Sequence, residues 1–141
     1  MSSTHSFPDL WNILHDGGIS AITGTVPGMV SLHVDIRYLA DRIAGAKTGF
    51  DISLICCTHL KFKPFDGSMP LEGPAAMASE ELEILSAEMS GAVCSITCVE
   101  GILEVTAADT TIQVHDNRVV TLQELRLAAE SYWKDFAKRK A

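Results

Sequence analysis

The sequence predicts an α+β fold that is mostly antiparallel β-sheet, a sandwich or partly closed barrel, with a short N-terminal helix and a C-terminal helix packed on the sheet. Three observations lead to this fold class. Apolar and polar residues alternate through much of the middle of the chain, turn-forming residues separate these segments, and helical periodicity is strongest at the two ends. A length of 141 residues with 47% hydrophobic residues suits one core, so we predict a single domain over residues 1–141.

The first predicted element is a short helix. Ser6 can serve as its N-cap, Pro8 has the backbone geometry of a first helical turn, and Gly17-Gly18 ends it. One face of this helix is apolar and consists of Leu10, Trp11 and Leu14.

Two strands are predicted next, over Gly18–Val26 and Met29–Ile36. Pro27-Gly28 joins them and suits a type II turn, because glycine accepts a positive φ. In the second strand the apolar and polar residues alternate: Val30, Leu32, Val34 and Ile36 against Ser31, His33 and Asp35. One face of this strand is therefore expected in the core and the other in water.

The segment that follows has weaker signals. We expect a helical turn at Tyr38–Ile43, followed by a strand that begins at Phe50 and has Ile52, Leu54 and Cys56 on one side. A short strand at Leu60–Phe62 then stops at Pro64, and residues 66–79 form a loop. Glu80–Met89 is compatible with a helix or an edge strand, and we favour a strand from Ile84 onward.

Three consecutive strands and a helix complete the chain. The strands are predicted over Val93–Val99, Ile102–Ala107 and Thr111–His115, with a turn signal at Asp116-Asn117. Thr121 and Glu124 form a capping box ahead of an apolar face at helical spacing, which consists of Leu122, Leu125, Ala129, Tyr132, Trp133 and Phe136. Because this face must dock on the sheet, we expect Trp133→Ala to cost roughly 3 to 5 kcal/mol of stability.

Charge is distributed unevenly along the chain. Residues 64–117 contain ten carboxylates and no lysine or arginine, whereas the preceding segment is balanced and the final segment has a net charge of +3. Nucleic acid and anionic membrane surfaces attract basic proteins, so the overall charge of −7 argues against both. An acidic face instead suits a basic protein partner or a homodimer formed with the basic final helix, although acidic residues also keep exposed strands soluble.

The N-terminus lacks the basic region and apolar stretch of a signal peptide, and no apolar run approaches the ~20 residues that span a bilayer. A cytoplasmic location is therefore expected, where the four cysteines are buried thiols rather than disulfides. On one strand Cys94 and Cys98 would lie roughly 13 Å apart, which is too far for two ligands of one zinc ion. We predict no metal site and no cofactor.

Two His/Asp pairs are the candidate binding residues, and no catalytic residue is predicted. His15 and Asp16 end the first helix, while His33 and Asp35 lie on the polar face of the second strand. If the two elements met, these groups would supply acid/base chemistry or polar ligand contacts. Helix termination and solvent exposure also explain the two pairs. The chain has no GxSxG, phosphate-loop, dinucleotide or HExxH motif.

The start of the chain contains the run Leu14-His15-Asp16-Gly17-Gly18-Ile19, followed by the Pro27-Gly28 turn and a strand that leads to Tyr38-Leu39. This arrangement resembles small uncharacterised bacterial proteins that have a Leu-His-Asp-Gly or His-Asp-Ala step before a strand. Some immunity-type proteins of toxin systems open similarly. The resemblance covers about the first quarter of the chain and an ending at Leu125–Trp133, and it does not extend to Gly18 or the acidic middle. It implies a bacterial accessory or binding protein and transfers no catalytic residue.

Two functional hypotheses follow. The first is a non-enzymatic binding or inhibitory module, immunity-like, with an acidic face for a basic protein partner. The alternative is a small-molecule-binding protein or enzyme, in which the two His/Asp pairs line a pocket between the sheet and the last helix. Absence of a catalytic motif favours the first hypothesis.

Overall fold

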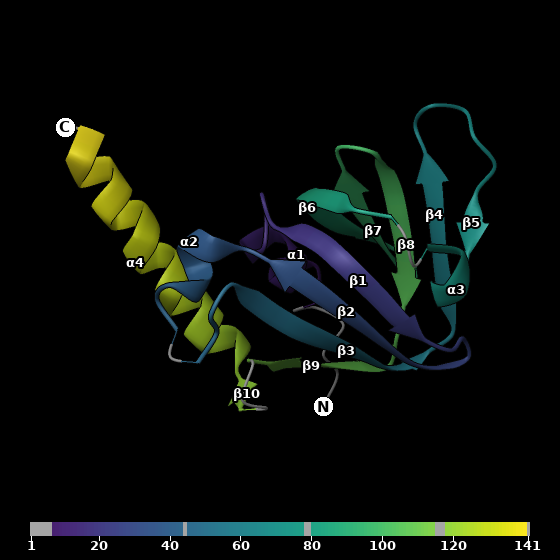
Figure 1. Ribbon diagram of the computed structural model, residues 1–141, viewed down its shortest axis with the longest axis horizontal. Helices are drawn as coiled ribbons and strands as arrows, with labels where there is room; N and C mark the ends of the chain where they lie inside the picture. The colour runs from purple at the N-terminus through teal and green to yellow at the C-terminus, as the bar shows by residue number, and fades with distance from the viewer. Residues whose placement is uncertain (1–6, 44, 78–79, 115–117, 141) are drawn as a thin grey trace.

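The computed structural model describes residues 7–43, 45–77, 80–114 and 118–140, and Figure 1 shows its architecture. In these parts of the chain there are four helices: α1 (Phe7–Ile13), α2 (Arg37–Ala40), α3 (Pro74–Met77) and α4 (Leu122–Lys140). The strands are β1 (Gly18–Gly24), β2 (Gly28–Asp35), β3 (Gly49–Cys57), β4 (His59–Pro64), β5 (Leu71–Glu72), β6 (Leu82–Ser90), β7 (Val93–Cys98), β8 (Gly101–Thr106), β9 (Asp109–Gln113) and β10 (Val119–Val120).

The ten strands form one antiparallel sheet in the order β10-β9-β3-β2-β1-β6-β7-β8-β4-β5. The sheet is not closed. It has two halves, because β1 and β6 pair through only two residue pairs, Gly18 with Glu83 and Ile19 with Leu82. The chain also passes between the halves where β3 leads into β4, and the Thr58 N–H there donates to the Thr106 carbonyl of β8 (2.9 Å). The predicted α+β class with a mostly antiparallel sheet is confirmed.

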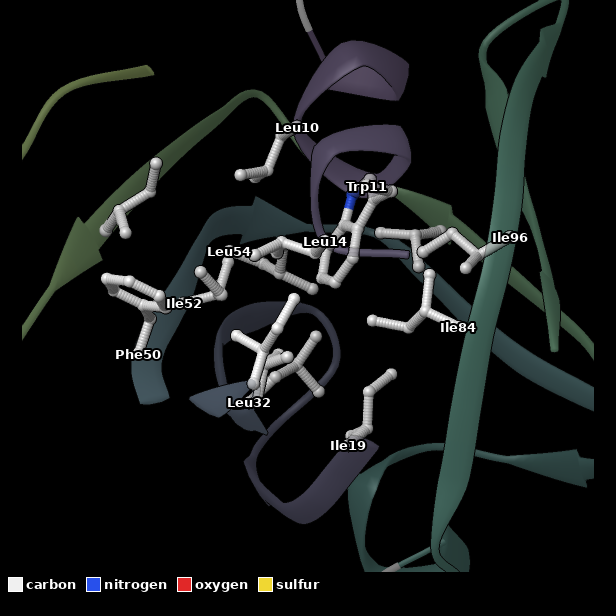
Figure 2. Close-up of a cluster of buried hydrophobic side chains, with 14 of the residues drawn as sticks. Leu10, Trp11, Leu14, Ile19, Leu32, Phe50, Ile52, Leu54, Ile84 and Ile96 are labelled. Carbon is white, nitrogen blue, oxygen red and sulfur yellow. The ribbon is translucent and has the colours of Figure 1, made fainter. Parts of the chain in front are cut away.

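Helix α1 fills the space between the two halves of the sheet. Its Trp11 is fully buried, and Figure 2 shows Leu10, Trp11 and Leu14 among side chains of both halves: Leu32, Ile52, Leu54, Ile84 and Ile96. The Asn12 side chain fixes the helix on β6, because it donates to the Ala87 carbonyl (3.0 Å) and accepts from the Ala87 N–H (2.9 Å). The apolar face predicted for this helix is therefore the centre of the core.

Helix α4 begins as predicted and then leaves the body of the protein. Thr121 Oγ1 accepts from the Glu124 N–H (3.1 Å) and Glu124 Oε1 accepts from the Thr121 N–H (3.3 Å), so the capping box is confirmed. Leu125 and Ala128 are buried, but the main contacts of α4 are with α1 and α2, and its distal half projects away from the sheet (Figure 1). Trp133 is 38% exposed, so the expected cost of 3 to 5 kcal/mol for Trp133→Ala is too large.

Several local expectations need correction. An extra residue in β3 lies between the pairs Val30–Leu54 and Gly28–Cys57, and this bulge reverses the alternation. Cys56 is consequently exposed with φ +52°, and Cys57 occupies the core position expected for Cys56. Gly28 has a positive φ as expected, but its value of +144° is far from the roughly +80° of a type II turn, and the Thr25 N–H donates to the Met29 carbonyl (3.1 Å), so the first turn is not type II.

The element boundaries also differ in places. Strand β6 begins at Leu82, two residues before the expected start. The expected loop contains β5 and α3, and the two-residue strands β5 and β10 were not predicted. Ser6 and Asp116-Asn117, assigned to a helix cap and a turn, lie outside the described residues.

Candidate functional site: an acidic patch with exposed apolar residues

The acidic stretch of the sequence is only partly neutralised by the fold. On the outer face of β8 and β4, Glu104 lies between two basic side chains: Lys63 Nζ is 2.8 Å from Glu104 Oε2, and His59 Nε2 is 3.1 Å from Glu104 Oε1. Hydrogen bonds from Lys63 and then from His59 lower the pKa of Glu104. Strand β4 thus brings cations from outside the acidic stretch next to its carboxylates, and Lys61 is likewise in register with Glu104 and Glu72.

Another group of acidic residues gathers where β4 ends, β6 begins and β7 turns into β8. Backbone hydrogen bonds connect the three segments: the Phe65 N–H donates to the Glu100 carbonyl (3.0 Å), and the Val99 N–H donates to the Glu83 carbonyl (2.9 Å). The Glu83 N–H also donates to Glu100 Oε1 (2.9 Å). We call Phe65, Asp66, Glu83, Val99 and Glu100 the acidic patch.

The acidic patch exposes two large apolar side chains among its carboxylates. Phe65 is 60% exposed and Val99 is 52% exposed. Glu80 and Glu81 add two exposed or half-buried carboxylates just before β6. Exposed apolar side chains next to charged groups are common features of protein–protein interfaces.

Local sequence explains why these segments meet. Gly101 pairs with Pro64 across β8 and β4, and a Cβ atom at Gly101 would lie 2.3 Å from the Lys63 carbonyl oxygen. Only glycine allows the two strands to approach this closely. Asp66 then accepts from the Ser68 N–H (2.8 Å), and hydrogen bonds from the Ser68 side chain and backbone lower the pKa of the Asp66 carboxyl, which is ionised at neutral pH.

Of the predicted binding residues, His33 and Asp35 lie together on the outer face of β2. His33 Nε2 is 3.0 Å from Asp35 Oδ1, and His33 Nδ1 is 2.7 Å from Asp51 Oδ1 on β3. Burial lowers the pKa of His33, but the hydrogen bond to Asp51, the charges of Asp35 and Asp51 and the hydrogen bond to Asp35 outweigh it, so the net shift is upward. Asp51 does not stand out in the sequence, because only the cross-strand register of β2 and β3 places it beside His33.

The other pair has different surroundings. His15 Nδ1 is 2.8 Å from the Asn12 carbonyl, and the His15 ring stacks on Trp133 with ring centroids 5.6 Å apart. His15 lines a groove of about 490 Å³ between α1 and α4, and neither Asp16 nor the second pair lines it. Asp16 has φ +70°, and its N–H donates to the Ile84 carbonyl (2.7 Å).

The structure does not join the two pairs in one hydrogen-bonded group among the described residues. His33 projects from the face of β2 opposite to the buried Leu32 and Val34. His15 instead follows helix α1, whose Trp11 lies among the buried side chains that include Leu32 (Figure 2). The shared pocket of the alternative hypothesis is not formed by these residues. Whether either pair binds a ligand stays a prediction.

The cysteines have the environment of small core residues, apart from Cys56. Cys57, Cys94 and Cys98 are buried, and burial raises the pKa of both Cys94 and Cys98 to about 12. These two thiols are therefore protonated and poorly nucleophilic at neutral pH. Within the described residues, no three or more His, Cys, Asp or Glu side chains are arranged to hold a metal ion.

No protein-family model, curated protein or solved structure matches this chain. Among the described helices, none combines the length and the apolar character needed to cross a membrane.

Proposed function

We propose that this protein is a non-enzymatic binding module that receives a basic protein partner on the acidic patch. The observation that carries the proposal is the exposure of Phe65 and Val99 directly beside Glu83 and Glu100. Exposed apolar side chains of this size provide contact area, and the surrounding carboxylates select a partner of opposite charge.

The charges around the patch favour a cationic partner. Lys63 is the nearest basic residue along the chain before Phe65, and its ammonium group is held by Glu104. Asp66, Glu83 and Glu100 all belong to residues 64–117, a segment that contains no lysine or arginine. A basic surface with an apolar centre would therefore gain contact area on Phe65 and electrostatic attraction at the rim.

Affinity capture from the native host tests the proposal with matched variants. Wild-type protein and the control E72Q/E88Q should retain a basic protein, because the control removes two carboxylates outside the patch. The variant E83Q/E100Q should lose it, and washing at about 0.5 M salt should release it from the wild type, since the Debye length there is only about 4 Å. Equal capture by all three proteins would contradict the proposal.

The identity of the captured protein tests the narrower, immunity-like form of this function. The resemblance of the first quarter of the chain to small bacterial accessory and immunity-type proteins supports a toxin as the partner. In that case the captured protein is a basic toxin encoded beside this gene, and its activity falls when this protein is added. A captured basic protein with no toxic activity would restrict the function to a general binding module.

A further inference from the structure

We infer that the distal half of α4 is itself a ligand for the acidic patch of a second copy of this chain. The inference rests on the proposed function, because both assign binding to the acidic patch. It specifies the partner as the α4 helix of another copy of the chain. Two adjacent residues and the two that follow them four positions later form one exposed face of the distal helix, because residues four apart lie one above the other on a helix. These residues are Trp133, Lys134, Ala137 and Lys138. We call this surface the basic helix face.

The basic helix face has the composition that the acidic patch requires. It combines the partly exposed ring of Trp133, one side of which stacks on His15, and an exposed alanine with two exposed lysine side chains. The sequence adds two more cations at Arg139-Lys140. The acidic patch combines Phe65 and Val99 with three carboxylates. The two surfaces therefore match in both apolar and charged character.

The helix dipole does not account for this whole face. Cations in the last turn of a helix stabilise its negative end, which explains Lys138 and the residues after it. Lys134 lies more than one turn from the end of α4, where the dipole has little effect. Asp135, the acidic residue of this region, is 2.8 Å from the guanidinium of Arg42, which lies in the turn after α2. It is thereby turned toward the body of the protein, while the lysines remain exposed.

The two surfaces belong to different ends of the molecule, so one chain does not bring them together. In Figure 1 the free end of α4 lies at the far left, and the end of β4 with the loop that follows it lies at the upper right. Contact thus requires a second copy, with the helix of one protomer on the patch of its partner. Such a head-to-tail contact uses two different surfaces. An assembly of this kind therefore keeps one free acidic patch and one free basic helix face, to which further copies can bind.

The contact is small and strongly charged, which sets how it should respond to salt and concentration. Two turns of helix on a patch of this size bury less than a standard protein–protein interface. Association is therefore weak, increases with protein concentration and is favoured at low ionic strength, because screening shortens the range of the lysine–carboxylate attraction. A basic partner on the acidic patch would compete with it.

Sedimentation equilibrium of the full chain tests the inference. At about 0.02 M salt the weight-average mass should rise with concentration to about twice the monomer mass or more, and at about 0.5 M salt it should return to the monomer mass. K134E/K138E and E83K/E100K should each stay monomeric at low salt. An equimolar mixture of these two variants should associate again, because each acidic surface then meets a basic one. E72K/E88K, which changes carboxylates outside the patch, should associate like the wild type.

A wild-type protein that stays monomeric at low salt, or a mixture that does not regain association, would overturn the inference. Its failure is distinguishable from failure of the proposed function. Capture of a basic host protein by the acidic patch without self-association removes the inference alone. Self-association without capture of a basic host protein removes the proposed function alone.

Discussion

At the scale of single residues, His33 shows how the sheet brings charged groups together that are distant in sequence. The ring lies between Asp35 on its own strand and Asp51 on the neighbouring strand, at 3.0 and 2.7 Å. The alternation of β2 was enough to predict that His33 and Asp35 are polar neighbours. Asp51 could not be predicted as a partner, because the segment between β2 and β3 is too long to fix the cross-strand register.

A pH-dependent stability follows from the His33 environment. Its folded-state pKa is raised above the ordinary 6.5, so the interaction stabilises the fold below pH 6.5 and is lost as the pH rises through the raised value. Urea denaturation should therefore show a larger difference between wild type and His33→Gln at about pH 5.5 than at about pH 8.5. If the stability difference between wild type and His33→Gln were instead larger at about pH 8.5, Asp35 and Asp51 would not be stabilising the protonated His33 ring.

At the scale of secondary-structure elements, α1 and α4 have opposite relations to the core. Trp11 of α1 is fully buried between the two halves of the sheet, while Trp133 of α4 is partly exposed and stacks on His15 and other rings at the surface. The sequence pattern of both helices is apolar on one face. This pattern does not reveal how far each helix continues along the body of the protein, so it predicts deeper burial for Trp133 than the structure shows.

The two tryptophans should therefore differ in their contribution to stability. Trp11→Ala removes a buried ring from the centre of the core and should cost about 3 to 5 kcal/mol. Trp133→Ala removes a half-buried ring and should cost about 1 to 2 kcal/mol, mainly from aromatic contacts. Urea denaturation of both variants measures the two costs, and equal costs would contradict the peripheral position of α4.

Element positions were largely predictable, whereas irregular features were not. Strict alternation located β2, β7 and β8 closely, and the capping box located the start of α4. The bulge in β3 could not be found this way, because one inserted residue changes which side chain is buried without leaving a distinct sequence signal. The two-residue strands β5 and β10 are too short to show a period.

At the scale of the whole molecule, a run of like charges in the sequence becomes two different surfaces. Around Glu104 the fold adds Lys63 and His59 and balances the charge, while at the acidic patch the carboxylates remain beside exposed apolar groups. The charge distribution of the sequence predicts an acidic face but not its location. The sequence does not place Phe65 and Val99 beside these carboxylates, because their proximity depends on long-range backbone hydrogen bonds to Glu100 and Glu83.

The association kinetics of the captured partner test the central proposal, that the acidic patch is a docking surface, most directly. For wild type and for E72Q/E88Q, the association rate constant should fall steeply between about 0.05 and 0.5 M salt, because complementary charges steer the encounter. E83Q/E100Q should associate more slowly at low salt and with little salt dependence, and Phe65→Ala should mainly raise the dissociation rate constant. Association rates that are independent of salt, with E83Q/E100Q and Phe65→Ala binding like the wild type, would contradict the proposal.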